Sequence, residues 1–244
     1  MKIDFYEEFP KESNLKKLKL IDFPCRVFFA SKSLEEFFDI EKNIKRINKK
    51  IDCAYWPIVK NSYWLSPFSN KNDLRELFFE INKINNHVLI DLELPFRARK
   101  KLMLKNLFCY FENKKLIKEF LEKNKKRITI AQFPFASIFY PLKFMGLNYD
   151  VNCEKSMMWY SSMNPNFVNN KIKRYLIHYR NKPNCSISLG TLATGILGNE
   201  PILSPENLKR DLEFVKTSGY EKAIIFRVEG LNQNYMQVIK HYLD

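Results

Sequence analysis

Glycine and histidine are scarce in this sequence of 244 residues, which contains six glycines and three histidines. The glycines do not form the Gly-x-Gly-x-x-Gly turn that follows the first strand of dinucleotide-binding α/β folds, so this kind of open sheet is disfavoured. The histidines His87, His178 and His241 have no evident carboxylate or cysteine partner in the sequence. A histidine-based catalytic triad is therefore not expected.

Cysteine occurs five times, but the five positions are scattered and include no Cys-x-x-Cys pair. An odd number of isolated cysteines is typical of reduced thiols in a cytosolic protein. The usual spacings of zinc ligands are also missing. We therefore expect no disulfide framework, no metal and no other cofactor.

Long apolar runs are missing as well, since none approaches the roughly 20 residues that a transmembrane helix needs. The N-terminal segment MKIDFYEEFP lacks the apolar stretch and cleavage site of a secretory signal. These two absences predict a cytoplasmic protein with no membrane partner.

Acidic residues are fewer than basic ones, 27 against 41, which gives a formal net charge of +14 at pH 7. Such a charge is compatible with nucleic-acid binding. However, the lysines occur in short mixed runs such as residues 41–50 and 114–126, which are typical of solvated helix faces. Aromatic RNA-recognition signatures, zinc-finger spacings and arginine-rich arms are absent. A nucleic-acid-associated protein is therefore the least favoured hypothesis.

Apolar residues are plentiful, at 45% of the sequence, and can form a large core. Eight apolar runs resemble buried strands, and most are separated by segments with helical spacing of apolar residues. The predicted strands are residues 3–7, 26–30, 53–56, 88–94, 128–132, 156–161, 186–190 and 223–229. Strands that alternate with helical crossovers form a parallel sheet, and eight such units close a barrel. The sequence therefore predicts an α/β fold, a single (β/α)8 TIM barrel that spans residues 1–244 as one domain.

Several helix ends are marked by capping residues. Ser33 precedes two glutamates, and Ser204 precedes Pro205, so each serine is expected to cap a helix N-terminus. Gly219 lies where the helix after Ser204 should end, just before the last predicted strand. These signals support the alternation of helices and strands.

Charged side chains alternate with apolar ones in two predicted strands. Asp91 and Glu93 share one face of the fourth strand, and Arg227 and Glu229 share one face of the eighth. Helices cover the outside of a barrel, so we expect these charges to point inward, near the C-terminal ends where barrel active sites lie. Glu8, after the first strand, is expected at the same rim.

These charges have two interpretations. They can form an ion-pair network that plugs the barrel, because a buried charge costs several kcal/mol unless it is paired. They can also form a site, since the inward carboxylates outnumber the single arginine, and crowding keeps one carboxyl protonated as a general acid. Trp56, Trp64 and Tyr160 are expected at the same mouth and are suited to stack against sugar rings.

Three segments resemble the chitinase-type glycoside hydrolases of family 18. That family ends its fourth barrel strand with an acidic D-x-x-D-x-D-x-E run, whose last half is matched by Asp91-Leu92-Glu93. Its sixth strand carries M-x-Y-D, of which residues 158–161 supply the first three letters, with Ser161 in place of the aspartate. A glycine turn after the seventh strand is matched by Leu189-Gly190-Thr191. The resemblance implies a barrel of glycosidase-like ancestry.

The resemblance also implies roles for three residues. Glu93 would protonate the leaving oxygen, Asp91 would orient an acetamido group of the substrate, and Tyr160 would bond to that group during substrate-assisted attack. The family's earlier aspartates fall on Asn86 and Leu89, and its strand-eight tryptophan is missing.

Apart from the resemblance to family 18, the residues alone are compatible with hydrolysis by two carboxylates, with Glu93 as the acid and Glu229 or Glu8 as nucleophile or base. Glu8, Trp56, Trp64 and Arg227 are then the expected substrate-binding residues for a small molecule or an oligosaccharide. The alternative is a barrel that binds a carbohydrate or an anion without catalysis. A basic run after Glu93, which comprises Arg97, Arg99, Lys100 and Lys101, has two interpretations: a solvated loop and helix start, which is favoured, or a rim that receives an anionic substrate.

Overall fold

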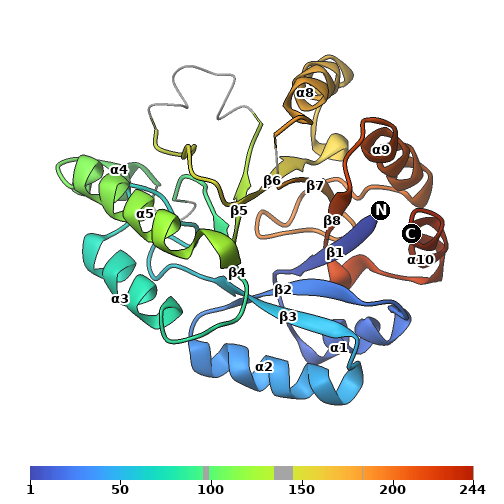
Figure 1. Cartoon of the computed structure of the whole chain (residues 1–244), viewed down its shortest axis with the longest axis horizontal. Helices are drawn as coiled ribbons and strands as arrows, with labels where there is room; N and C mark the ends of the chain where they lie inside the picture. The colour runs from blue at the N-terminus through green and yellow to red at the C-terminus, as the bar shows by residue number, and fades with distance from the viewer. Residues whose placement is uncertain (96–98, 135–144, 183, 244) are drawn as a thin grey trace.

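Eight parallel strands form a closed barrel in the computed structural model, which describes residues 1–95, 99–134, 145–182 and 184–243. Each strand pairs with the next in sequence, and β8 pairs with β1 (Figure 1). The strands are β1 (Lys2–Glu7), β2 (Cys25–Ser31), β3 (Ile51–Pro57), β4 (Val88–Asp91), β5 (Ile128–Gln132), β6 (Glu154–Trp159), β7 (Cys185–Gly190) and β8 (Lys222–Phe226). The predicted (β/α)8 TIM barrel is confirmed.

Helices surround the barrel in the described parts of the chain (Figure 1). The α-helices are α1 (Glu12–Leu15), α2 (Leu34–Ile47), α3 (Lys71–Ile81), α4 (Arg99–Lys105), α5 (Tyr110–Asn124), α8 (Asn166–Tyr179), α9 (Pro205–Thr217) and α10 (Gln233–Lys240). Short 3-10 helices lie at η1 (Lys16–Leu20), η2 (Lys125–Arg127), η3 (Ser161–Met163) and η4 (Val228–Gly230). As predicted, Ser33 caps α2 and Ser204 caps α9, each accepting a backbone N–H, and Gly219 follows α9 with a φ of 83°.

Two apolar layers build the core. The outer layer lies between strands and helices and includes Ile3 and Phe5, while the inner layer fills the barrel and includes Tyr6. This alternation along β1 is the one expected of a strand, in which successive side chains point to opposite faces. Parallel strands buried on both faces need apolar residues on both, which explains their nearly continuous apolar runs.

The sequence analysis predicted the wrong face of the eighth strand to point into the barrel. Ile224 and Phe226 belong to the inner layer, whereas Ile225 and Val228 pack in the outer layer. The strand ends at Phe226, so Arg227 and Glu229 follow it in the connection toward η4 instead of lying on its inward face. The fourth strand is also shorter than predicted, and Glu93 lies beyond its end.

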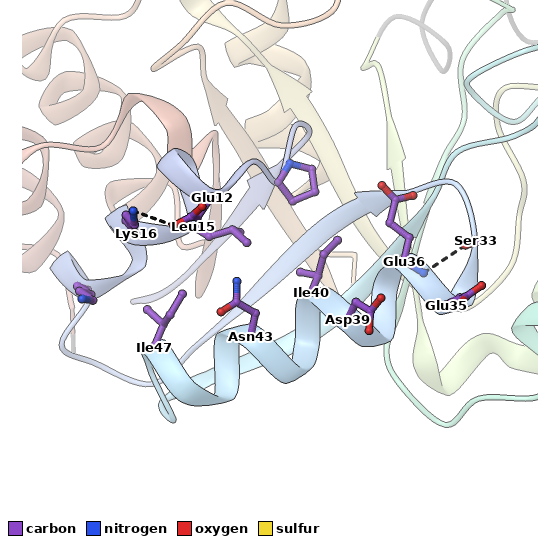
Figure 2. Close-up of a pocket in the computed structure, with 12 residues that line it drawn as sticks. Glu12, Leu15, Lys16, Ser33, Glu35, Glu36, Asp39, Ile40, Asn43 and Ile47 are labelled. Carbon is purple, nitrogen blue, oxygen red and sulfur yellow. Dashed lines mark hydrogen bonds and ion pairs between the residues drawn. The ribbon is translucent and has the colours of Figure 1, made fainter.

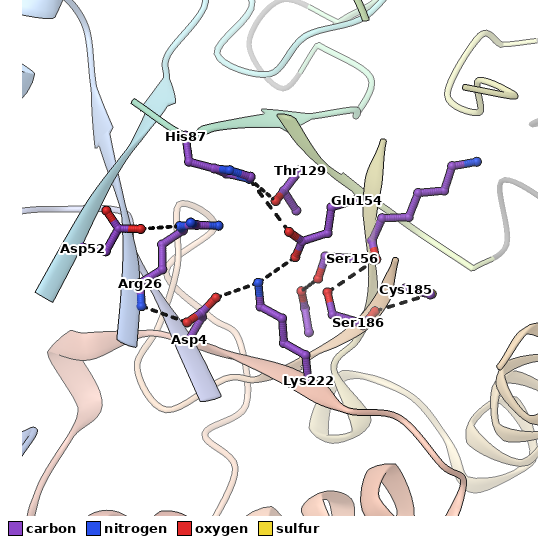
Figure 3. Close-up of polar contacts among 12 residues, drawn as sticks. Asp4, Arg26, Asp52, His87, Thr129, Glu154, Ser156, Cys185, Ser186 and Lys222 are labelled. Carbon is purple, nitrogen blue, oxygen red and sulfur yellow. Dashed lines mark hydrogen bonds and ion pairs between the residues drawn. The ribbon is translucent and has the colours of Figure 1, made fainter. Parts of the chain in front are cut away.

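A polar network closes the N-terminal end of the barrel (Figure 3). Lys222 Nζ lies 2.7 Å from Asp4 Oδ2 and 2.7 Å from Glu154 Oε1. His87 Nε2 lies 2.7 Å from Thr129 Oγ1, at the start of the neighbouring strands. The burial of His87 and the nearby Arg26 and Lys222 charges lower the pKa of its imidazole to about 3. The charged groups at this end are therefore paired with one another, and the network has a structural role.

Within the described residues, no helix is both long and apolar enough to cross a membrane.

Candidate functional site

A cavity of about 100 Å³ lies at the C-terminal mouth of the barrel, where the strands end. Six residues that the sequence placed at the mouth line it: Glu8, Trp56, Trp64, Asp91, Glu93 and Tyr160. They come from the ends of β1, β3, β4 and β6 and from the loop after β3. Strand ends on one side of a parallel barrel converge, which is why residues distant in sequence meet here.

Arg227 and Glu229 are not among the described residues that line this cavity. Instead, Arg227 Nη1 lies 3.2 Å from Glu8 Oε2, and Arg227 Nη2 forms an ion pair with the Glu229 carboxylate. The Arg227 and Glu8 side chains are each 3% exposed, while the Glu229 side chain is 37% exposed. Arg227 therefore supports the cavity through Glu8.

Glu8 is held on both carboxylate oxygens. The Tyr63 hydroxyl donates a hydrogen bond of 2.9 Å to Oε1, and Arg227 donates to Oε2. Burial raises the pKa of Glu8, and Tyr63 and Arg227 oppose this rise while the charge of Glu200 adds to it. Two fixed partners leave this carboxylate in one orientation toward the cavity.

Glu7 points away from the cavity and ties β1 to the connection after β8. Its carboxylate accepts hydrogen bonds from Phe9 N–H at 3.0 Å, Asn14 Nδ2 at 3.1 Å and Glu229 N–H at 2.8 Å. Burial raises the pKa of Glu7 to about 7, against the opposing effect of the Arg227 charge. Because this carboxylate fixes the backbone on both sides of the Glu8–Arg227 pair, it holds that pair in register.

Asp91 occupies the end of β4 and is almost fully buried. Its Oδ1 atom has no hydrogen-bond partner within the described parts of the chain. Burial raises the pKa of Asp91 well above its usual value, and the negative charge of Glu8 raises it further. Asp91 is therefore protonated at a pH where a free aspartate is ionised, and it can donate a hydrogen bond into the cavity.

Aromatic rings form much of the cavity wall. Tyr160 stacks on Phe226 with ring centroids 5.5 Å apart, and Trp56 packs against Tyr6 at 5.6 Å. The Trp56 indole N–H is buried, and no described residue accepts its hydrogen bond. Burial raises the pKa of the Tyr160 hydroxyl, so this group stays a neutral donor. Together these groups present apolar faces beside hydrogen-bonding atoms.

Sequence reasoning missed Glu200, which lines the cavity from the loop between β7 and α9. Its Oε1 atom accepts a hydrogen bond of 3.0 Å from Leu197 N–H, and its Oε2 atom is buried with no partner among the described residues. Gly195 allows this approach, because a Cβ there would lie 2.8 Å from Glu200 Oε1 and 3.2 Å from Glu8 Oε2. One signal was available, since Glu200 is the single carboxylate between residues 191 and 204.

Larger hollows lie elsewhere on the described parts of the barrel, and two of them, unlike a third of about 740 Å³ that includes Glu8, share no residue with the mouth cavity. One, of about 820 Å³, separates α2 from α1 and η1 and is lined by exposed charges such as Glu12, Lys16 and Asp39 (Figure 2). The other, of about 750 Å³, lies at the N-terminal end and is lined by mixed polar residues, which include the exposed Lys125 and Lys126 and the half-buried Glu154. Neither hollow has the buried carboxylates of the mouth cavity.

The basic run after Glu93 is only partly described. Arg97 lies outside the described residues, while Lys100 and Lys101 are exposed on α4. Within the described parts of the chain, no group of three or more His, Cys, Asp or Glu side chains is placed to hold a metal ion.

No family model and no curated protein sequence matches the chain. Solved structures do match its fold. The spore cortex-lytic enzyme SleL of Bacillus megaterium QM B1551 is 10% identical, with a TM-score of 0.61 over 100% of this chain and 74% of that enzyme. A class V chitinase from Nicotiana tobaccum is 12% identical, with a TM-score of 0.56 over 99% of each chain. A 3-keto-D-glucoside 4-epimerase from E. coli is 8% identical, with a TM-score of 0.53 over 99% and 98% of the two chains. The chain is therefore similar in fold to barrels that include glycoside hydrolases.

Proposed function

We propose that this protein is a glycoside-hydrolase-like barrel that acts on a carbohydrate at its C-terminal mouth. One observation carries the proposal: the carboxylates of Glu8, Asp91, Glu93 and Glu200 line the same cavity as the rings of Trp56, Trp64 and Tyr160. Carboxylates supply the acid and base of glycoside hydrolysis. Aromatic rings supply flat faces against which the C–H bonds of a sugar ring can stack.

Glu93 is assigned the role of general acid. It follows the buried end of β4 and is half-buried, so it can reach both a leaving oxygen and solvent. Asp91, two residues earlier and kept protonated, would hold the substrate by donating a hydrogen bond, and the Tyr160 phenol would bond to the same part of it. These roles are the ones implied by the resemblance to family 18.

The second carboxylate is assigned to Glu8 in preference to Glu229. Glu8 lines the cavity and is oriented by Tyr63 and Arg227, whereas the Glu229 carboxylate pairs with Arg227 outside the cavity wall. Glu229 then becomes a positioning residue that helps to fix Arg227. The fold shared with a chitinase is in keeping with a carbohydrate substrate.

A non-catalytic carbohydrate-binding barrel is the second candidate, and one observation favours it. Family 18 has an aspartate at the position of Ser161. The Ser161 hydroxyl donates a hydrogen bond to the buried Asp211 of α9, and so it is engaged with the helix layer. A barrel that has lost this acid at the site can keep substrate binding and lose turnover.

The two candidates are separated by Glu93→Gln, assayed with aryl glycosides and with neutral and N-acetylated oligosaccharides. Loss of a general acid costs about 10²–10⁴-fold in rate, so turnover by the parent should fall by at least about 100-fold. Glu76→Gln, which changes an exposed carboxyl on α3, is the matched control and should retain full activity. Turnover that survives in Glu93→Gln would exclude Glu93 as the acid. Binding of saccharides by the parent without any turnover would favour the non-catalytic barrel.

A further inference from the structure

Three buried polar atoms around the mouth cavity lack a partner among the described residues: Trp56 Nε1, Asp91 Oδ1 and Glu200 Oε2. These residues are 4%, 7% and 8% exposed, and all three line the cavity. Buried polar atoms are almost always hydrogen-bonded, and those that are not demand an explanation. A bound ligand that accepts from the indole, donates to the Glu200 carboxylate and hydrogen-bonds with the Asp91 carboxyl would complete all three.

The charges around the cavity indicate which kind of hydrogen-bond donor the ligand carries. Glu8 and Glu200 approach each other across Gly195, where a Cβ would touch a carboxylate oxygen of each. Arg227 is the cation at Glu8, but it also pairs with Glu229, so its charge is shared. Glu200 makes no ion pair with a described residue, and a buried carboxylate without a counter-charge is unfavourable. An anionic ligand would be repelled here, and a cationic one attracted.

The aromatic wall favours the same kind of ligand. The rings of Trp56, Trp64, Tyr160 and Phe226 line the cavity beside the carboxylates. A cation is attracted to the face of an aromatic ring, most strongly when both are withdrawn from water. Aromatic rings recognise organic ammonium cations in this way, and the adjacent carboxylate supplies a counter-charge.

We propose that the mouth cavity binds the protonated amine of an amino sugar, with Glu200 as its charge partner and the aromatic rings around it. This inference rests on the proposed carbohydrate function and specifies its substrate class. The amine donates to Glu200 Oε2, while hydroxyl groups of the same sugar accept from the Trp56 indole and bond with Asp91. Anionic sugars, such as sugar phosphates and uronic acids, are excluded by the Glu8–Glu200 pair.

Isothermal titration calorimetry at about pH 6 tests the proposal with three matched tetrasaccharides, built of glucosamine, N-acetylglucosamine and glucose. The parent should bind the glucosamine tetramer at least about 10-fold more tightly than the glucose tetramer. Glu200→Gln should remove this preference and leave the affinity for the glucose tetramer within about twofold. Glu76→Gln, which removes one exposed carboxylate from α3, should keep the preference and so controls for net charge.

A second variant guards against misfolding of Glu200→Gln. Gly195→Ala keeps every charge but places a methyl group between Glu200 and Glu8, and it should also abolish the preference for the amine. If the parent binds all three tetramers equally, or if Glu200→Gln weakens all three equally, the amine site is refuted while the carbohydrate function stands. If the parent binds none of them, both the amine site and the proposed function are refuted.

Discussion

Replacement of Arg227 by methionine is expected to destabilise the barrel strongly. The change keeps an apolar stem of similar length but removes the guanidinium that lies 3.2 Å from Glu8 Oε2. The Glu8 side chain is 3% exposed, so its carboxylate would be left buried without its cation. Breaking a buried pair from one side costs about 3–5 kcal/mol. For a protein of this size, each kcal/mol lowers the Tm by roughly 2–4 °C, so a decrease of roughly 6–20 °C is expected.

The assay is thermal unfolding followed by circular dichroism, with urea titration as a second measure. Lys16→Met is the matched control, because it breaks the exposed Lys16–Glu12 pair, whose side chains are 64% and 77% exposed. Exposed pairs contribute less than about 1 kcal/mol, so this variant should unfold near the parent. The double variant with Glu8→Gln removes both charges and should recover at least half of the loss.

The destabilisation caused by Arg227→Met should also depend on pH, and the direction of this dependence can be checked. The raised pKa of Glu8 means that its protonated form is favoured in the folded protein, and loss of Arg227 raises this pKa further. The loss of unfolding free energy in Arg227→Met should therefore be largest near neutral pH. It should become smaller as the pH falls and Glu8 is protonated. If Arg227→Met and Lys16→Met have the same Tm at neutral pH, the view of Arg227 as a buried counter-ion is refuted.

Two further predictions concern the ends of the barrel. The pKa of His87 is about 3 in the folded protein and about 6.5 when unfolded, so stability should fall by about 2 kcal/mol between about pH 6.5 and pH 4.5. His87→Gln should flatten that decline in urea titrations, and equal acid slopes for the two proteins would contradict the burial of a neutral imidazole. Gly230→Ala would place a Cβ 2.0 Å from the Leu192 carbonyl oxygen, so it should cost roughly 1–3 kcal/mol, and an unchanged urea midpoint would contradict this packing.

The sequence was sufficient for the barrel because every strand contains buried apolar residues. It was also sufficient for the position of Asp91, since a lone carboxylate within the run Leu89–Leu92 must lie on the inner face near the strand end. In β8, by contrast, Ile224, Ile225 and Phe226 are all apolar, so periodicity could not decide which of them faces inward. The wrong choice placed Arg227 and Glu229 on the inner face.

The pairings at the mouth depend on tertiary structure. Glu8 and Arg227 are 219 positions apart and meet because β1 and β8 close the barrel. Glu200 lies in a loop without periodicity, and its approach to Glu8 depends on the absence of a side chain at Gly195. Loop residues of this kind are positioned by a folded scaffold, and so their partners cannot be read from local spacing.

The most direct test of the carbohydrate site is a crystal structure of Glu93→Gln with the glucosamine tetramer. We predict one sugar ring in the mouth cavity, with its amine beside Glu200, its ring face against Trp56 or Phe226, and a hydrogen bond to Asp91. A saccharide bound at the N-terminal hollow or between α1 and α2, with the mouth cavity filled by solvent alone, would contradict the assignment.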